Sequence, residues 1–267
     1  MKEKILIISG NLLKHKFAAL KVLKKFKNSK VIFEKYPKKI FKNYTKTSSE
    51  IIKKHFHNVE RYEKQYFKKY IEAEKKFLQK RTLLSVNKGK INTKKFYNLL
   101  IKENPKIILI NATSKISDDI LNKFKNKIIN IHAGLTPYYK GAGCNVWTFY
   151  YKELKYTGIT IHFVNSKIDS GMIITQKQSK FQKNDNTHTI GCKNAILGSK
   201  LAIKSILFLL KNSSYKGKNL KIRKKNIKVC FKKSFNENVV KAVNKNIEQG
   251  MVKDYCRKVQ KIKLVEI

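Results

Sequence analysis

The stretch that decides the fold is 127–141, Lys127-Ile128-Ile129-Asn130-Ile131-His132-Ala133-Gly134-Leu135-Thr136-Pro137-Tyr138-Tyr139-Lys140-Gly141. A short apolar run that ends at turn residues predicts a strand buried within a sheet. Because alternate side chains of a strand share a face, Asn130 and His132 are expected to point the same way at its carboxyl end. Ligand sites of open α/β sheets form at such ends, so a reacting centre is predicted here.

The same strand pattern recurs along the chain, separated by amphipathic stretches. Buried-strand runs are predicted at 4–8, 31–33, 105–110, 158–164 and 172–178. Helices are predicted at 12–26, 117–124 and 187–210. This alternation is typical of the α/β class, and it predicts an open, mostly parallel Rossmann-like sheet with helices on both faces.

Two regions depart from this alternation. Residues 48–104 are charge-dense and are interpreted as a helical insertion, with Leu83 and Leu84 among its inward positions. Beyond Asn212 the chain becomes lysine-rich, with a strand candidate at 227–231 and a helix near 237–248. We therefore predict a catalytic domain over 1–211 and a small C-terminal extension over 212–267, since 267 residues suffice for one large core with an appendage.

The chain carries a formal net charge of +44, which would attract any polyanion. Its composition argues against nucleic-acid readout, because only four of the 61 basic residues are arginine, the side chain that best recognises phosphates and bases. The lysines are spread among many Ile, Asn, Phe and Tyr residues, all encoded by AT-rich codons, and a genome with a strong AT bias would produce this pattern. In either case such a surface concentrates phosphorylated or polyglutamylated small molecules.

Several classes of function are excluded by pattern. No run of about eighteen apolar residues predicts a membrane span, and the apolar stretch before Gly10 is too short for a signal peptide, so a cytoplasmic protein is expected. The four cysteines are dispersed and form no metal-ligand pattern, so neither a metal site nor a disulfide framework is expected. The turn at Gly10 lacks the further glycines of a dinucleotide-binding fingerprint, so redox chemistry with a nucleotide cofactor is not expected.

Residues 130–141 resemble the 10-formyltetrahydrofolate-dependent formyltransferase family, in which an Asn-x-His strand end precedes a loop with leucine, proline and glycine. A second match is the strand 158–164, the turn Ile168-Asp169-Ser170-Gly171 and the outgoing strand 172–176. The resemblance covers about 105–178, and more loosely 4–26. It implies the formyltransferase fold.

Formyl transfer from a folate nitrogen to an amine requires stabilisation of an oxyanion and two proton movements. The resemblance assigns these tasks to three residues: Asn130 hydrogen-bonds the formyl oxygen, His132 stabilises the tetrahedral intermediate, and Asp169 orients His132 and handles protons through water. It further implies that 10-formyltetrahydrofolate is the co-substrate and that no metal takes part. The residues implied to bind the folate are Leu135, Pro137, Gly141 and Ile168.

Other polar and aromatic residues keep simpler interpretations. Taken alone, Asp169 is explained as an ordinary turn aspartate, because Asp-Ser-Gly is common in turns. Its spacing and its flanking strands favour a functional role. His162 and His188 are expected to be packed or surface histidines. Trp147 and Phe149 are expected in the core, with stacking on a pterin as the alternative.

The acceptor is the least defined part of the prediction. Gly134 and Thr136 stand where familiar members of the family have a serine and a leucine. The motif therefore does not indicate which acceptor this protein uses. We expect a primary amine on a small anionic acceptor, such as a nucleotide-linked amino sugar or glycinamide ribonucleotide, and the helical insertion is expected to cover the acceptor side. A homodimer is an open alternative to a monomer.

Two alternatives remain. One is a methionyl-tRNA formyltransferase, which usually carries a β-barrel C-terminal domain larger than the residues after Asn212 would allow. The other is a non-catalytic relative that binds folate or RNA.

Overall fold

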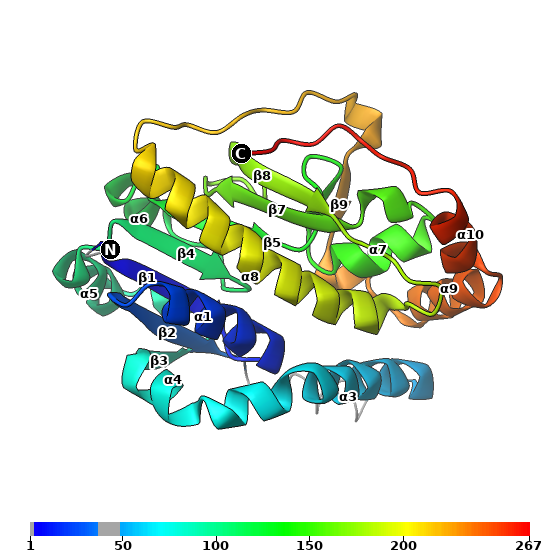
Figure 1. The fold of residues 1–267 in the computed structure, drawn as a ribbon, viewed down its shortest axis with the longest axis horizontal. Helices are drawn as coiled ribbons and strands as arrows, with labels where there is room; N and C mark the ends of the chain where they lie inside the picture. The colour runs from blue at the N-terminus through cyan, green and yellow to red at the C-terminus, as the bar shows by residue number, and fades with distance from the viewer. Residues whose placement is uncertain (1–2, 37–48) are drawn as a thin grey trace.

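A seven-stranded sheet forms the centre of the computed structural model, which describes residues 3–36 and 49–267 (Figure 1). The strand order is β3-β2-β1-β4-β5-β7-β8. The strands are β1 (Ile5–Gly10), β2 (Ser29–Lys35), β3 (Thr82–Asn87), β4 (Ile107–Asn111), β5 (Ile128–His132), β7 (Gly158–Phe163) and β8 (Ile173–Gln178). The first five run parallel, whereas β7 pairs antiparallel with both β5 and β8. The predicted open, mostly parallel sheet is confirmed.

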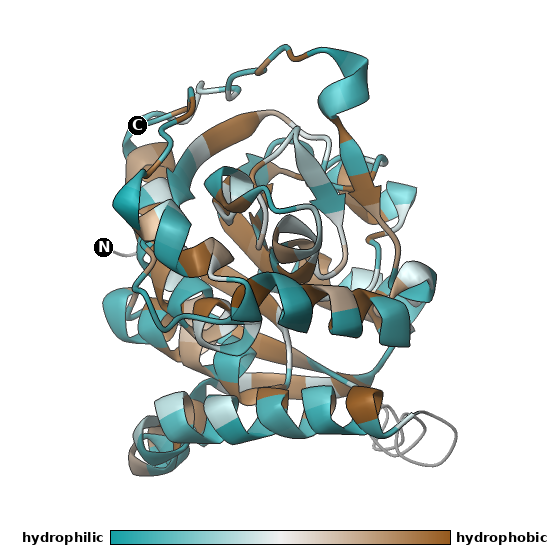
Figure 2. Ribbon diagram, turned by 90° about the vertical axis from the view of Figure 1, so that its right-hand side faces the viewer, coloured by the Kyte–Doolittle hydropathy of each residue, from teal (hydrophilic) through white to brown (hydrophobic). Residues whose placement is uncertain are grey.

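Helices cover both faces of this sheet. On one face, α1 (Leu13–Lys25) and α8 (Thr187–Lys211) pack over a core that includes Ile5 and Ile7 of β1. On the other, α5 (Lys94–Glu103) and α6 (Asp118–Lys123) pack over a core that includes Leu6 and Ile8. Strand β1 thus buries both of its faces, which is why it is apolar at consecutive positions rather than at alternate ones. Figure 2 shows the apolar strands enclosed by helices with hydrophilic outer turns.

The predicted all-helical insertion at 48–104 is wrong in one part. The region does contain α3 (Glu50–Ala73), α4 (Lys75–Arg81), the 3-10 turn η1 (Lys90–Asn92) and α5, but between them the chain adds β3 to the edge of the sheet. Leu83 and Leu84 therefore lie on a strand and pack against the α5–α6 core. Four residues of this edge strand are half-buried and two are exposed, so it lacks the continuous apolar run that marks central strands.

The C-terminal residues fold against the loop that follows β5. Strand β9 (Lys228–Cys230) pairs with β6 (Tyr139–Gly141) in a separate two-stranded sheet. Helices α9 (Glu237–Glu248) and α10 (Met251–Arg257) share a core with α7 (Cys144–Tyr150), and the remaining 3-10 turns are η2 (Leu154–Tyr156), η3 (Lys224–Asn226) and η4 (Lys232–Ser234). The strand and helix predicted here are confirmed, while the domain boundary at 211/212 stays a prediction. Among the described helices, none has the length and apolarity to cross a membrane.

Candidate active site

The site is built on the neighbouring strands β5 and β7. In their antiparallel register Asn130 lies opposite His162, and His132 lies opposite Thr160. Residues directly opposite in such a pair share a face, so four polar side chains meet at one end of two otherwise apolar strands. The sheet therefore places Asn130 and His132 side by side, as the alternation along the sequence predicts.

The Asp169 carboxylate joins these side chains. It lies in the turn between β7 and β8 with φ of 42°, in the left-handed region. One carboxylate oxygen, Oδ2, accepts a 2.8 Å hydrogen bond from the backbone nitrogen of Gly141 and lies 3.3 Å from His132 Nδ1. The other, Oδ1, accepts a 3.2 Å hydrogen bond from Asn130 Nδ2 and lies 3.4 Å from His162 Nε2. All three residues predicted as catalytic are thus brought into direct contact.

These partners keep Asp169 ionised. Burial acts to raise the pKa of Asp169, but the charge of His132, the contacts with His162 and the Gly141 N–H outweigh it and lower that pKa to about 2. Favourable contacts to a carboxylate are the usual reason for so low a value. The site therefore carries a fixed negative charge at every physiological pH.

His132 lies between two oxygen acceptors. Its Nε2 is 3.0 Å from the carbonyl oxygen of Tyr139, and its Nδ1 faces Asp169. Cys144 Sγ also approaches Nε2, at 3.7 Å. Burial lowers the pKa of His132, whereas the Asp169 charge and the Tyr139 carbonyl act in the opposite direction, and burial prevails. The imidazole is consequently held at both nitrogens, and its lowered pKa favours the neutral ring at neutral pH.

His162 is packed in the interior, one of its two expected placements, and it also contacts the residues of the site. The ring is buried, its Nδ1 lies 2.7 Å from the carbonyl oxygen of Phe163, and its Nε2 lies 3.2 Å from Asn130 Nδ2. With Nδ1–H donating to that carbonyl, Nε2 is left to accept from Asn130. Both hydrogens of the Asn130 amide are then directed at His162 and Asp169. The signal in the sequence was the polar residue two places after Thr160 in a buried strand.

A second polar network fixes the loop that follows β5. Thr160 Oγ1 donates to the carbonyl oxygen of Gly134 at 2.7 Å and accepts from the backbone nitrogen of Thr136 at 3.1 Å. Gln176 Nε2 donates to the carbonyl oxygen of Thr136 at 2.6 Å. The Thr136–Pro137 peptide bond is cis. These bonds hold the start of the loop on β7 and β8, next to His132.

The four residues predicted to bind the folate differ in accessibility. Leu135 is completely buried and lies against Gly158, so its side chain packs the core rather than lining a surface. Pro137 and Gly141 are half-buried, and Ile168 is 55% exposed beside Asp169. Their role toward folate stays a prediction, and for Leu135 only the backbone is placed to fulfil it. Trp147 and Phe149 are buried, which confirms the core interpretation.

Lys140 supplies a positive charge at the rim of the site. Its Nζ donates to Ser170 Oγ at 2.8 Å, next to Asp169. Burial lowers the pKa of Lys140, and the Asp169 charge partly restores it. Within the described residues no group of three or more His, Cys, Asp or Glu side chains forms a metal-binding arrangement.

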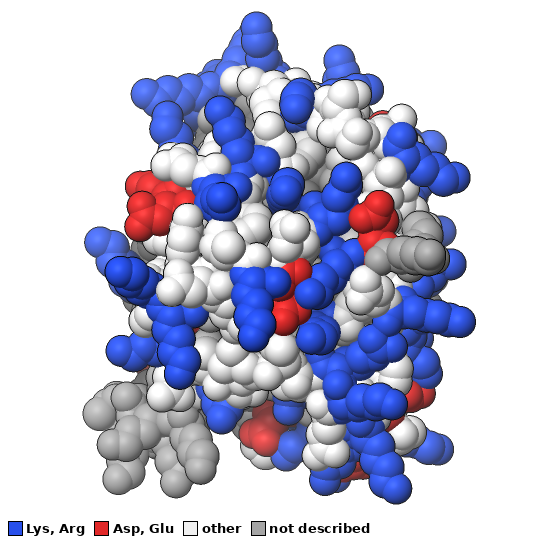
Figure 3. Space-filling view, turned by 90° about the vertical axis from the view of Figure 1, so that its left-hand side faces the viewer, with Lys and Arg blue, Asp and Glu red and all other residues white. Residues whose placement is uncertain are grey.

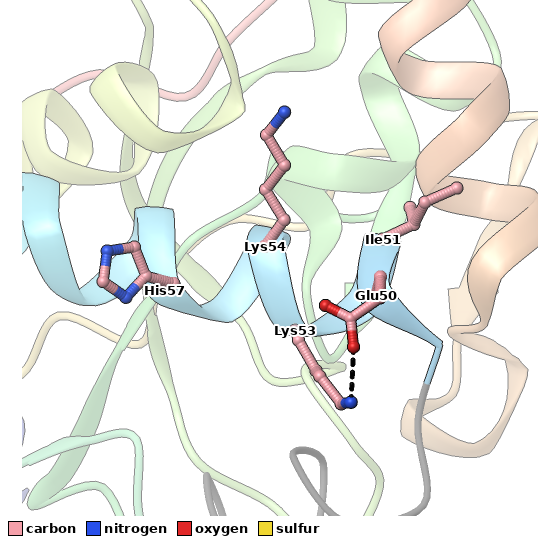
Figure 4. Close-up of a pocket in the computed structure, with 5 residues that line it drawn as sticks. All are labelled: Glu50, Ile51, Lys53, Lys54 and His57. Carbon is pink, nitrogen blue, oxygen red and sulfur yellow. Dashed lines mark hydrogen bonds and ion pairs between the residues drawn. The ribbon is translucent and has the colours of Figure 1, made fainter.

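An open hollow of about 510 Å3 lies elsewhere, against the first turns of α3, and is lined by Glu50, Ile51, Lys53, Lys54 and His57 (Figure 4). Lys53 pairs with Glu50 at 2.6 Å, and Lys54 and Ile51 project away from that ion pair. None of the Asp169 cluster lines it, so the hollow is not the reacting centre. That this region covers the acceptor side stays a prediction.

Comparison with known proteins identifies the family of the chain. The family model described as "Formyl transferase" matches residues 24–206. That range includes β5, β7 and the turn with Asp169, and it spans more than half of the chain. The chain belongs to the formyl transferase family.

Individual relatives resemble only part of the chain. The methionyl-tRNA formyltransferase of Caldicellulosiruptor saccharolyticus is 36% identical over 112 residues, which is 42% of this chain and 36% of that protein. The bifunctional polymyxin resistance protein ArnA of Wigglesworthia glossinidia brevipalpis is 33% identical over 123 residues, which is 46% of this chain and 19% of that protein. The matched stretch therefore spans well under half of each relative.

Solved structures share the fold over most of the chain. A sugar N-formyltransferase from a Shewanella species superposes with a TM-score of 0.55 at 16% identity, covering 92% of this chain and 88% of that one. The phosphoribosylglycinamide formyltransferase of Bacillus halodurans superposes with a TM-score of 0.54 at 16% identity, covering 79% and 97%. At such identities the likeness concerns the fold alone.

Proposed function

We propose that this protein transfers a formyl group from 10-formyltetrahydrofolate to a primary amine on a small anionic acceptor. The observation that carries the proposal is the contact of the Asp169 carboxylate with both Asn130 and His132, at 3.2 and 3.3 Å. The contact lies at the carboxyl end of β5, where α/β sheets bind ligands. Membership of the formyl transferase family gives this arrangement its chemistry.

The proposed reaction begins with attack of the amine nitrogen on the formyl carbon. A new C–N bond forms, and negative charge develops on the formyl oxygen of a tetrahedral intermediate. Asn130 and His132 stabilise that charge by hydrogen bonding, which is commonly worth about 3–4 kcal/mol per donor. The bond from the formyl carbon to the folate nitrogen then breaks, and that nitrogen takes the electron pair and a proton. Asp169, working through His132 and water, moves the proton from the amine.

The Asn130 amide must exchange a partner to take part. Its two hydrogens are directed at Asp169 Oδ1 and His162 Nε2, both at 3.2 Å. A formyl oxygen placed beside Asn130 replaces one of these acceptors. The exchange with His162 is the easier of the two, because a neutral imidazole nitrogen is a weaker acceptor than an ionised carboxylate.

The anionic acceptor is inferred from charge. The formal net charge is +44, and Lys140 stands at the rim of the site with its Nζ on Ser170. Such a surface favours phosphorylated or nucleotide-linked amines, and it favours a polyglutamylated folate as donor. A nucleotide-linked amino sugar and glycinamide ribonucleotide are the acceptors that fit this description best.

A second candidate is a methionyl-tRNA acceptor, favoured by the relative of that name that is 36% identical over 112 residues. A non-catalytic folate- or RNA-binding role fits less well, because Asn130, His132 and Asp169 are all present and in contact.

The test is an assay of tetrahydrofolate release from 10-formyltetrahydrofolate with a panel of amines. The panel holds glycinamide ribonucleotide, nucleotide-linked amino sugars and methionyl-tRNA. Turnover that depends on one small anionic amine supports the proposal and identifies the acceptor. Turnover with methionyl-tRNA alone supports the second candidate, and tetrahydrofolate release that is independent of any amine contradicts both.

A further inference from the structure

The first half of the C-terminal region is an exposed cationic strip, defined here as residues 212–236. It holds nine Lys or Arg residues and no Asp or Glu. Lys221, Arg223, Lys224 and Lys225 are all exposed. The longest regular elements in the strip have three residues each, so the chain runs largely extended over the surface (Figure 1).

The strip has few carboxylates close to it. Some lysines elsewhere are neutralised locally, as Lys4 is by Glu103 at 2.9 Å and Lys14 by Glu63 at 3.1 Å. In the strip Lys228 pairs with Glu153, but across the described residues no carboxylate lies within ion-pair distance of Lys221, Arg223, Lys224 or Lys225. Figure 3 shows the general pattern on one face, where a few acidic groups stand among many basic ones.

The strip leads to the active site. Lys218, near the start of the strip, exchanges two backbone hydrogen bonds with Ile173 of β8, at 2.8 and 2.7 Å, which ties it to the sheet edge. Farther along the strip is β9, where Cys230 is the register partner of Gly141. Gly141 in turn donates its backbone N–H to Asp169. A linear polyanion bound from Lys218 to β9 would therefore end beside the reacting centre.

Exposed aromatic rings accompany the charges near that end. Phe231 is 48% exposed, and Tyr151 is 46% exposed with Lys228 Nζ 5.0 Å from its ring centroid. Flat rings beside cations are the means by which proteins bind single-stranded nucleic acids, with bases stacked on the rings and phosphates on the cations. An acidic protein offers no bases to stack, and a membrane surface selects an amphipathic helix that the strip lacks.

We infer that residues 212–236, together with Tyr151, form a binding surface for single-stranded nucleic acid. This inference is independent of the transfer reaction and does not require that the nucleic acid be the formyl acceptor. RNA and DNA share the phosphates and bases that the strip would contact, so they are tested separately.

The experiment measures fluorescence anisotropy of a labelled 16-nucleotide RNA, and of the matching DNA, over a series of salt concentrations. The strip variant combines Lys221→Gln, Arg223→Gln, Lys224→Gln and Lys225→Gln. A control variant with the same loss of charge combines Lys94→Gln, Lys95→Gln, Lys102→Gln and Lys123→Gln, which are exposed and lie on α5 and α6. All eight side chains are on the surface, so both proteins should fold.

At near-physiological salt the strip variant is expected to bind at least about tenfold more weakly than the unmodified protein, and the control within about twofold. If all four cations touch phosphates, the slope of log affinity against log salt falls by about 3, since each contact to a single strand contributes about 0.7. Phe231→Ala is expected to weaken binding about fivefold or more with an unchanged slope, because stacking is not ionic.

Binding of RNA, DNA or both in this pattern supports the inference. Equal losses of nucleic-acid affinity in the strip and control variants would show that binding depends only on the overall positive charge of the protein. Polyglutamate of equal charge that binds as tightly as either nucleic acid would show that the bases contribute nothing. Either result overturns the proposed surface. Nucleic-acid binding is expected to persist in Asp169→Asn. The binding test can therefore be interpreted even if the proposed formyl transfer is not observed.

Discussion

Asn130 and His162 are register partners on β5 and β7, and Asn130 Nδ2 lies 3.2 Å from His162 Nε2. The same amide also contacts Asp169, so one asparagine links a buried histidine to the carboxylate of the site. The geometry assigns His162 a positioning role: it holds the amide and the carboxylate in place without being needed as a proton donor.

His162→Phe should therefore impair transfer while preserving the core. The ring volume is similar, but the Asn130 amide loses its hydrogen-bond acceptor in a site with little solvent. A buried polar group left without its partner costs about 1–3 kcal/mol, which corresponds to a fall in kcat of about fivefold to 150-fold. The KM for the folate donor should stay within about twofold, because His162 lies beneath Asn130 rather than on the surface. Steady-state kinetics of purified variants measures both constants.

His162→Gln is the matched rescue for that variant. A glutamine side chain can accept from Asn130 through its own carbonyl oxygen, so part of the lost kcat should return. If the Phe and Gln variants are equally slow while their thermal unfolding midpoints match the unmodified protein, the hydrogen bond to Asn130 has no positioning role.

His132 should titrate below its ordinary range. Burial lowers its pKa from 6.5, although the Asp169 carboxylate opposes this shift. The neutral ring is therefore expected to predominate at pH 7, and protonation is expected only as the pH falls below 6.5. Because the pKa of Asp169 is about 2, that carboxylate should add no second step between pH 4 and pH 8. Titration of the imidazole proton resonances by NMR measures this directly.

Removal of the Asp169 carboxylate charge should lower the pKa of His132 further. In Asp169→Asn the attraction that favours imidazolium is lost, so the pKa of His132 should fall below its value in the unmodified protein. A titration that moves to higher pH in this variant would mean that His132 and Asp169 do not interact as the structure shows.

Gly141→Ala should destabilise the fold more than an alanine at another left-handed glycine. At Gly141 φ is 91°, and an added Cβ would lie 2.3 Å from the carbonyl oxygen of Cys230. Gly89 has a similar φ of 84°, with no atom within 4 Å of the added Cβ among the described residues. Gly89→Ala should thus cost only the backbone strain, about 1–2 kcal/mol, and Gly141→Ala about 1–3 kcal/mol more from overpacking. Chemical denaturation of both variants measures the difference, and equal losses would place β9 away from β6.

The central sheet could be predicted from the sequence because its strands are buried on both faces and are apolar at consecutive positions, as Ile5 to Ile8 are. The edge strand β3 could not, since Ser85 and Asn87 are exposed and the strand carries no continuous apolar run within a charge-dense stretch. Strand alternation places Asn130 and His132 on one face, and the resemblance to formyltransferases singled out these two residues together with Asp169. His162 was missed because its partner lies on another strand, and register is set by pairing rather than by local pattern.

The most direct test of the account compares single-turnover formyl transfer by the unmodified protein and His132→Ala, with donor affinity measured by calorimetry on the same preparations. The account predicts a rate lower by about 10²-fold to 10³-fold in the variant, as expected when one oxyanion donor is removed, and a donor affinity nearly unchanged. Equal rates for the two proteins would contradict the assignment of the Asn130–His132–Asp169 cluster as the reacting centre.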